Sequence, residues 1–505
     1  ANGTTQLSGK GQFTNQQGVV SVQELEWISN SGFSNQKGHI NANSSTVKAQ
    51  SVNNTEGQWF NQKALSIAVT EALDNSQGQL VAGGNTNLSA KTFNNSTGQL
   101  VTSGQLNATV AQALINQQGL ISANEALTVK AGSLDNSKGS VASAKDTVSL
   151  TATQAFNNQQ GQVSAAKALA VSAGSVDNQQ GVLSGDTLEL TATTGQLNNR
   201  KGTLLSHANS NINVHGLDNA GGSVHSNGVL SINTNGVLLD NQLGKVSANT
   251  LAVNSGDIHN QQGLLSANTQ AKIDAGNINS QGGVIQAGNS LSLNAADVNN
   301  DEGLIYAQQA DLNVQQLSNQ RTKAQETGIQ AEQLRISADS LNNNQGQIVS
   351  GQDLPLTVRD SLSNTEGVIS SNGVLSIGSD SNTQPSISND QGRIQAAGDV
   401  AINASELNSS GDILSNGSLN LNVNGDVIQS GNVAAQQDMV FNAKQVSNSG
   451  NIQAGGNLQT NSSHWNNNQG VIEANRIVMH TGNLSNQAGR IQQNGFGDFN
   501  MEVGA

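Results

Sequence analysis

The stretch Phe156-Asn157-Asn158-Gln159-Gln160-Gly161-Gln162-Val163 carries the pattern that decides the fold, because this pattern returns about every 20 residues along the chain. It reads as an apolar residue, any residue, Asn, two mostly polar residues, Gly, any residue and an apolar residue. Twenty copies keep this internal spacing, with glycines at 18, 38, 57, 78, 98, 119, 139, 161, 181, 202, 222, 244, 263, 283, 303, 346, 367, 392, 470 and 489. Looser copies raise the number to 24, around Gly328, Gly411, Gly431 and Gly450.

Three positions of the motif hold one kind of residue in nearly every strict copy. The positions five before and two after the glycine are apolar in all twenty copies, and the position three before it is Asn in nineteen, with Ser280 as the exception. Between motifs, large apolar residues alternate with small or polar ones, as in Ala168-Leu169-Ala170-Val171-Ser172-Ala173. This period of two predicts strands whose side chains point alternately inward and outward.

A repeat of short strands and turns with this period predicts an all-β fold, a right-handed parallel β-helix (solenoid) of about 24 coils of about 20 residues. We expect a single continuous β-helix segment over residues 1–505. A β-sandwich or a meander of hairpins is the alternative, but either would need tight reversals between strands. The chain has only two prolines, as expected where nearly every strand donates backbone hydrogen bonds to its neighbours.

The motif asparagines should lie directly above one another in such a stack. Because a side-chain amide both donates and accepts, we expect them to form a structural ladder of hydrogen bonds. The predicted ladder includes Asn75, Asn95, Asn116, Asn136, Asn158, Asn178, Asn199, Asn219, Asn241 and Asn260. Asn-Gly pairs at 227–228, 372–373 and 416–417 predict further corners, with a positive backbone φ.

Two insertions interrupt the period, at residues 320–327 and 378–386. In the first, Gly328 follows Asn319 after nine residues instead of three, so six additional residues are predicted to leave the stack and project into solvent. A solvated surface loop is one interpretation, and a recognition site on a rigid support is the other. The candidate receptor contacts are the three charged residues of this turn, Arg321, Lys323 and Glu326.

The composition argues against several classes of function. A net charge of −14 without a clustered basic face disfavours a nucleic-acid partner. The chain has no cysteine for a disulfide or a thiolate metal site, and no apolar run approaches the roughly 18 residues of a transmembrane segment. His207, His215 and His225 lie within two coils but in different columns, which predicts surface histidines rather than a zinc site. We expect no catalytic residue, no metal and no cofactor.

Each repeat consists of Gly-x-apolar-x-(Ala/Ser), then an alternating strand, then apolar-x-Asn-x-x-Gly. This order of elements resembles the filamentous haemagglutinin repeat of two-partner secretion exoproteins. The resemblance covers the chain from Phe13 to at least Ile491. It implies an extracellular Gram-negative shaft that is exported unfolded through an outer-membrane transporter. The parent would be a filamentous haemagglutinin adhesin or a contact-dependent growth inhibition effector, whose secretion domain and toxin module are not recognised within this chain.

The resemblance therefore predicts an extracellular structural shaft, which presents a receptor-binding or toxin region at a distance from the cell. It implies a secreted protein on the bacterial outer surface, with the outer-membrane two-partner secretion transporter as one partner and a receptor on a host or neighbouring cell as another. The alternative from a different class is a carbohydrate-active β-helix enzyme, a lyase or a hydrolase. Such enzymes hold acidic residues close together, whereas the acids of this chain are scattered over its turns.

Overall fold

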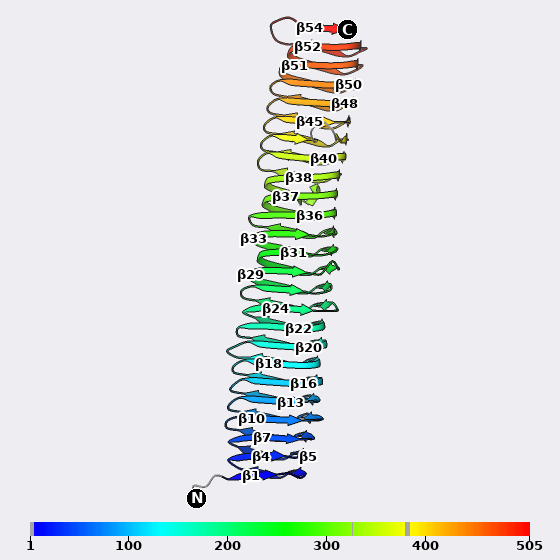
Figure 1. Cartoon of the computed structure of the whole chain (residues 1–505). Helices are drawn as coiled ribbons and strands as arrows, with labels where there is room; N and C mark the ends of the chain where they lie inside the picture. The colour runs from blue at the N-terminus through cyan, green and yellow to red at the C-terminus, as the bar shows by residue number, and fades with distance from the viewer. Residues whose placement is uncertain (1–4, 326, 379–383, 505) are drawn as a thin grey trace. The chain divides into compact units, whose positions relative to one another are not determined.

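Each coil of the chain is built from short β-strands that pair in parallel with the equivalent strands of neighbouring coils. The computed structural model describes residues 5–325, 327–378 and 384–504. The chain divides into two units, Ala1–Gly256 (unit 1) and Asp257–Ala505 (unit 2). Figure 1 shows the stacked strands of each unit.

The described part of unit 1 consists of strands and turns. Its strands are β1 (Gln6–Gly9), β2 (Phe13–Thr14), β3 (Val19–Ser21), β4 (Glu24–Ile28), β5 (Gly32–Ser34), β6 (His39–Ala42), β7 (Ser44–Ala49), β8 (Ser51–Asn53), β9 (Gln58–Asn61), β10 (Leu65–Val69), β11 (Ala72–Asp74), β12 (Gln79–Ala82), β13 (Thr86–Ala90), β14 (Thr92–Asn94), β15 (Gln99–Thr102), β16 (Leu106–Ile115), β17 (Leu120–Ala123), β18 (Leu127–Asp135), β19 (Ser140–Ser143), β20 (Val148–Asn157), β21 (Gln162–Ala165), β22 (Ala168–Asp177), β23 (Val182–Gly185), β24 (Thr187–Ala192), β25 (Leu197–Asn198), β26 (Thr203–Ser206), β27 (Ser210–Asn213), β28 (Leu217–Asp218), β29 (Ser223–Asn233), β30 (Leu239–Asp240) and β31 (Lys245–Asn254).

The described part of unit 2 adds one short 3₁₀ helix, η1 (Lys323–Gln325), to the same kind of strands. Its strands are β32 (Ile258–His259), β33 (Leu264–Asp274), β34 (Asn277–Asn279), β35 (Val284–Ala287), β36 (Ser290–Asn299), β37 (Leu304–Ser318), β38 (Gly328–Asn342), β39 (Gln347–Ser350), β40 (Leu354–Ser363), β41 (Val368–Ser371), β42 (Leu375–Ile377), β43 (Ser386–Ser388), β44 (Arg393–Ala396), β45 (Val400–Ala404), β46 (Glu406–Ser409), β47 (Asp412–Ser415), β48 (Leu419–Gln429), β49 (Asn432–Ala435), β50 (Met439–Asn448), β51 (Asn451–Asn466), β52 (Val471–Ser485), β53 (Arg490–Gln493) and β54 (Asn500–Val503).

Equivalent positions pair one coil apart, which produces three columns of parallel strands. The strands after the motif glycine form one column, in which β19, β21 and β23 pair. The second and third columns often share one long strand, as β18, β20 and β22 do. Unit 2 repeats the arrangement, with β41, β44 and β47 in the first column.

The core of a coil follows from the period of two. In the coil that starts at Asn158, Val163, Leu169, Val171 and Val176 point inward and are at most 2% exposed. The alternate side chains face outward, so every coil buries a small apolar set against the coils on both sides. This stacking makes a core from a chain that is only 34% hydrophobic.

The predicted fold class is confirmed as a parallel β-solenoid, with about 25 turns of roughly 20 residues. The motif positions five before and two after the glycine are buried in every strict copy except at Val20, Leu484 and Ile491. No α-helix occurs in residues 5–325, 327–378 and 384–504. That residues 1–505 form a single continuous segment stays a prediction.

The prediction of a positive φ at the three Asn-Gly corners is wrong, because none of their residues adopts one. A Cβ on Gly228 would collide with Oδ1 of Asn209, one coil earlier. That oxygen accepts a hydrogen bond from the backbone N of Val229 at 2.9 Å. The glycine is therefore required for a close approach rather than for an unusual backbone angle. The same arrangement recurs at Gly373 with Asp353 and at Gly417 with Asp399.

Candidate functional site

The motif asparagines form an uninterrupted ladder inside unit 1. Each Nδ2 donates to Oδ1 of the asparagine one coil further on, as Asn158 does to Asn178 at 2.7 Å and Asn178 to Asn199 at 2.8 Å. The bond repeats in every coil from Asn15 to Asn241. From Asn35 onward these side chains are 0% exposed, so the amides satisfy one another where no water reaches them.

Each ladder amide also closes its own corner and touches the next one. Nδ2 of Asn158 lies 3.2 Å from the backbone O of Gly161 and 3.3 Å from that of Val182, in the following coil. The backbone N of Gly161 donates to the backbone O of Asn158 at 2.9 Å. One side chain thus links the turn, its neighbour and the ladder, which gives these asparagines a structural function.

The motif glycine is required because the corners of successive coils lie very close together. A Cβ on Gly161 would lie 2.6 Å from Oδ1 of Asn158 and closer still to the backbone O of Asn136, one coil earlier. The positive φ belongs instead to the residue before the glycine, as in Gln160 with φ 57°. For an L-residue this left-handed conformation costs about 1–2 kcal/mol, which the hydrogen bonds of the corner offset.

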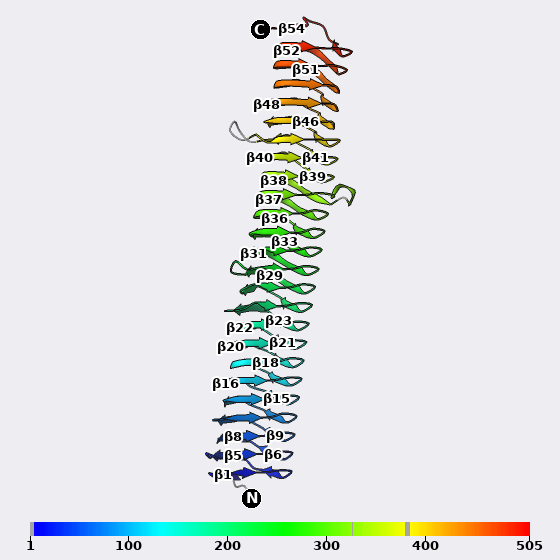
Figure 2. The same ribbon diagram turned by 90° about the vertical axis from the view of Figure 1, so that its right-hand side faces the viewer.

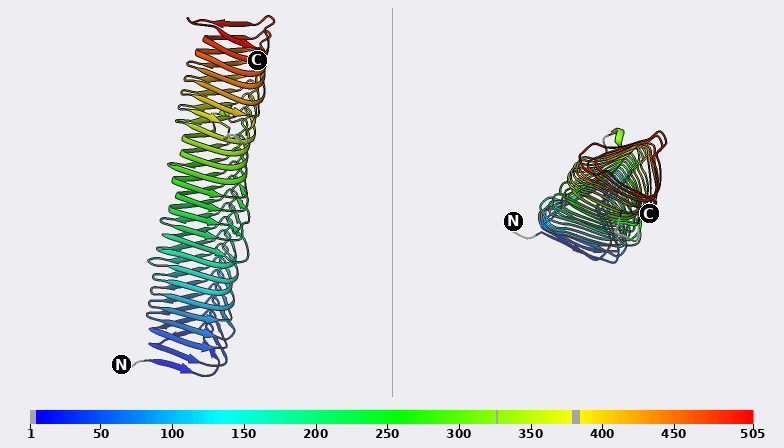
Figure 3. Two further views of the ribbon diagram at one scale, coloured as in Figure 1. Left: turned by 45° about the horizontal axis from the view of Figure 1, so that its top comes forward. Right: turned by 90° about the horizontal axis from the view of Figure 1, so that it is seen from above.

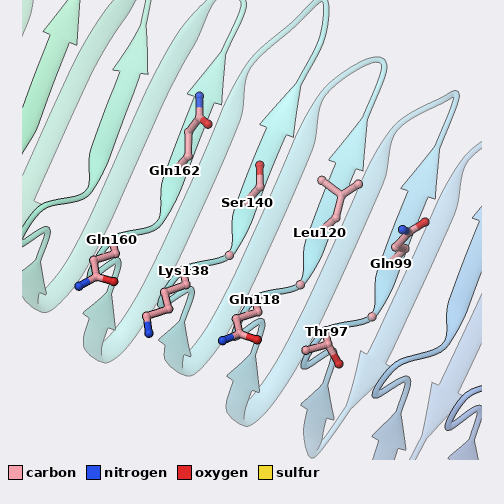
Figure 4. Close-up of a pocket in the computed structure, with 11 residues that line it drawn as sticks. Thr97, Gln99, Gln118, Leu120, Lys138, Ser140, Gln160 and Gln162 are labelled. Atoms are coloured by element: carbon pink, nitrogen blue, oxygen red, sulfur yellow. The ribbon is translucent and has the colours of Figure 1, made fainter.

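A shallow groove of about 400 Å³ follows this glycine column in unit 1. Thr97, Gln118, Lys138 and Gln160 form one bank, as Figure 4 shows. The groove exists because the glycines between its banks have no side chains. The other bank consists of Gln99, Leu120, Ser140 and Gln162. Its lining includes no Asp or Glu, and so lacks the pair of carboxylates that glycoside hydrolases use.

The ladder of unit 2 is irregular in two places, at Ser280 and between Asn389 and Asn448. Asn260, predicted as a ladder member, donates to the hydroxyl of Ser280 at 3.0 Å, and Oδ1 of Asn300 has no partner. The asparagine bonds continue at 2.8 Å from Asn300 through Asn319, Asn343 and Asn364 to Asn389. They resume at 2.7 Å from Asn448 through Asn467 to Asn486. The interval between these two runs contains Ser409 and Gln429.

The first insertion is shorter than the sequence indicates, because the regular corner extends to Thr322. Arg321, with φ 56°, occupies the left-handed position of the corner, so Thr322 stands where other coils have the glycine. Gly328 N donates to the backbone O of Gly303 at 2.8 Å, which is the bond that the residue after the motif glycine makes elsewhere. The interpretation of Gly328 as a motif glycine is therefore wrong. The extra residues are the five at 323–327 rather than six.

The buried side chain of Thr322 makes this corner possible. It is 0% exposed, and its Oγ1 accepts a hydrogen bond from Gln347 N at 2.9 Å. In regular coils that N–H donates to the backbone O of the motif glycine, as Gln162 N does to Gly139 at 2.9 Å. The hydroxyl thus replaces the carbonyl while the chain turns outward into the insertion.

The insertion is anchored to the coils on both sides of it. Arg321 Nε donates to Glu302 Oε1 at 2.8 Å, and this hydrogen bond raises the pKa of Arg321. Lys323 Nζ donates to the backbone O of Glu366, 43 residues further on, at 3.1 Å. Both cations are exposed, and Glu326 lies outside the described residues. The prediction that the turn projects holds for η1, which lies beyond the outline of the neighbouring coils in Figures 2 and 3.

One exposed aromatic residue near the insertion was not singled out from the sequence. Tyr306, the only tyrosine of the chain, points outward from β37 and is 48% exposed. Its register partners are Gln286 and Gln330, and Nε2 of Gln330 donates to the backbone O of Thr327 at 3.1 Å. A tyrosine at an outward position of the alternating pattern was the signal that could have identified it.

The other positions noted from the sequence do not gather around this insertion. The second insertion follows β42, so it leaves a different corner from the first, and residues 379–383 lie outside the described residues. His207 and His215 are exposed, whereas His225 contacts Ser247 Oγ at 2.8 Å and Asn227 Oδ1 at 2.9 Å. Across the described ranges no group of three or more His, Cys, Asp or Glu residues is arranged to hold a metal ion. The described part of the chain also contains no helix with the length and apolarity to cross a membrane.

The sequence model of the haemagglutinin repeat matches residues 1–115, 81–160, 147–194, 183–242, 228–282, 246–328, 331–392, 387–462 and 414–495. These overlapping matches tile most of the chain. No curated protein and no solved structure matches it. The repeat family is one of structural adhesin shafts rather than enzymes. The periodic motif of the chain, its stacked coils and these matches together show that the chain belongs to the haemagglutinin-repeat family.

Proposed function

We propose that the chain is a shaft segment of a secreted bacterial surface protein, which holds a receptor-binding or toxin region away from the cell. The observation that carries this proposal is the buried ladder of unit 1, in which each coil is bonded to the coil before it and the coil after it. A stack held together in this way extends by adding equivalent coils without a new core for each length. This property suits a spacer.

The same architecture supports export by a two-partner secretion transporter at the outer membrane. A chain without cysteine forms no disulfide that would hinder its passage in an unfolded state. Each newly emerged coil would complete the hydrogen bonds of the preceding one, so folding proceeds along the chain. An adhesin and a contact-dependent growth inhibition effector would both use such a shaft.

We further place a receptor contact of this shaft at the insertion with η1. Arg321 and Lys323 are exposed cations that hydrogen bonds to Glu302 and Glu366 hold in place, so they present positive charge at fixed positions on the surface. Tyr306 is the register partner of Gln330, whose side chain donates to Thr327 at the end of this insertion. The exposed ring of Tyr306 therefore lies close to that end. Exposed Tyr and Arg side chains on a rigid surface are frequent energetic centres of protein interfaces.

The test removes the insertion while leaving a regular corner. A variant with residues 323–327 deleted, Arg321→Gln and Thr322→Gly keeps the ladder Asn319 and restores the motif Asn-Gln-Gln-Gly before Gly328. We expect it to keep its β-sheet circular dichroism spectrum, because the regular corner fits the stack. Binding of the fluorescent chain to cultured epithelial cells and to Gram-negative cells, measured by flow cytometry, should fall about tenfold or more.

The matched control is Lys138→Gln, which removes a cation from the equivalent left-handed position of a corner in unit 1. It should leave binding unchanged. A folded deletion variant that binds as strongly as the parent would contradict the receptor contact. Release of reducing sugars by the parent chain from bacterial or plant polysaccharides would instead contradict the structural function and favour the enzyme alternative.

A further inference from the structure

The ladder of unit 2 is interrupted at one buried glutamine. Gln429 is 1% exposed and stands in the ladder column, where it pairs in register with Ser409 before it and Asn448 after it. Neither its Nε2 nor its Oε1 has a hydrogen-bond partner. At this coil the ladder therefore contributes two unsatisfied polar atoms instead of two hydrogen bonds.

The side chains before and after Gln429 in the ladder column form hydrogen bonds with other partners. The hydroxyl of Ser409 accepts from Asn389 at 3.1 Å and donates to the backbone O of Gly411 at 3.3 Å. Oδ1 of Asn448 accepts from the backbone N of Gly450 at 3.2 Å, while its Nδ2 donates onward to Asn467. The glutamine amide is one methylene further from the backbone than an asparagine amide, so it does not lie level with either neighbour.

The corners of these three coils are also shorter than the rest. The glycine follows the ladder residue after two positions rather than three, in Ser409-Ser410-Gly411, Gln429-Ser430-Gly431 and Asn448-Ser449-Gly450. None of these residues has a positive φ. The bond between Gly N and the backbone O of the ladder residue, which closes regular corners, is replaced at Gly411 by a bond to the backbone O of Asn389, one coil earlier.

The backbone pairing continues through the gap. Ser430 N donates to the backbone O of Ser409 at 2.9 Å, and Ser449 N donates to that of Gln429 at 2.9 Å. The coils remain stacked in the folded state, but the contact between them lacks the buried ladder bonds found elsewhere. It keeps part-buried side-chain bonds, such as the one from Asn442 Nδ2 to Asn422 Oδ1 at 2.9 Å. In a solenoid whose coils touch only their neighbours, stability depends on each interface in turn, so one weak interface limits the cooperativity of the stack.

We propose that Gln429 is a built-in breakpoint, at which the coils from Asn432 onward in unit 2 open as one group while those before Ser409 stay folded. This property is independent of any receptor. The Ser280 position serves as an internal comparison, since it leaves only Oδ1 of Asn300 without a partner and keeps a regular three-residue corner with Gly282 at φ 61°. Opening there should be less frequent.

Hydrogen exchange of the full chain in low urea, resolved by peptide, tests the proposal. Amides of β49 and β50 should exchange about tenfold faster than those of β44 and β47, with the step at Gln429. Gln429→Asn places an asparagine in the ladder column of this short corner, where Asn448 already occupies the equivalent position of the next coil. This substitution should reduce the step in exchange rate about tenfold. The exposed control Gln445→Asn should leave the step unchanged.

A second variant keeps the test decisive if Gln429→Asn does not fold. Gln429→Leu removes both unsatisfied atoms at similar volume, so it should also reduce the step, although it adds no ladder bond. Exchange rates that change gradually from β44 to β52 without a step would overturn the proposal. A step that is unaffected by both substitutions would overturn it as well.

Discussion

Gly161→Ala should destabilise unit 1 by about 3 kcal/mol, among the largest effects that we expect from a single methyl group in this chain. The added Cβ would lie 2.6 Å from Oδ1 of Asn158 and closer still to the backbone O of Asn136. Neither atom can retreat easily, because one belongs to the ladder and the other to the backbone of the adjacent corner. The free energy of unfolding in urea, followed by circular dichroism, measures the effect.

The control for this substitution is Gly11→Ala, where a Cβ would meet no atom within 4 Å. It should change the free energy of unfolding by less than about 0.5 kcal/mol. If Gly161→Ala were as mild as Gly11→Ala, the explanation of the glycine column by close approach would fail.

Asn178→Ala should cost about 1–3 kcal/mol, because it opens the ladder on both sides. Asn158 Nδ2 would lose its 2.7 Å bond, although it keeps contacts with two backbone oxygens. Asn199 Oδ1 would lose the ladder donor that reaches it at 2.8 Å and would remain buried. The urea midpoint of unfolding measures the loss.

Gln179→Ala is the matched control, one residue away. Its backbone N donates to Asp177 Oδ1 at 3.0 Å, a bond that the substitution leaves in place. We expect almost no change in its midpoint. Equal midpoints for Asn178→Ala and Gln179→Ala would remove the ladder from the account of stability.

Repetition explains how much of the fold was predictable from the sequence. Each motif position occurs twenty times, so the inward direction of Phe156 and Val163 and the stacking of Asn158 on its equivalents follow from one pattern. The conformation of the corner did not follow from it. Whether a Cβ fits at Gly161 depends on the coil below, and the positive φ of Gln160 leaves no trace in residue type because Gln, Lys, Glu and Thr all occur at that position.

The candidate site was predictable in place but not in its contacts. The broken spacing located the insertion, yet the sequence pointed to Gly328 as its end and could not show that Thr322 takes the glycine position. The anchor of Lys323 on Glu366 joins residues 43 apart, a contact that no local pattern encodes. Tyr306 was missed because it is a single residue at an outward position of a regular strand. Gln429 was missed because the looser copies of the motif do not show which residue stands in the ladder column, nor that its amide has no partner.

The most direct test of the stacked-coil account compares the deletion of one whole coil with the deletion of half a coil. Removing residues 158–177 joins Asn157 to Asn178 and lets Asn136 donate to Asn178 in place of Asn158, with every strand column intact. Removing residues 158–167 displaces the remaining strands from their partners. We predict that the whole-coil variant unfolds cooperatively near the urea midpoint of the parent, whereas the half-coil variant loses much of the β-sheet signal of unit 1. Similar damage from both deletions would contradict the account.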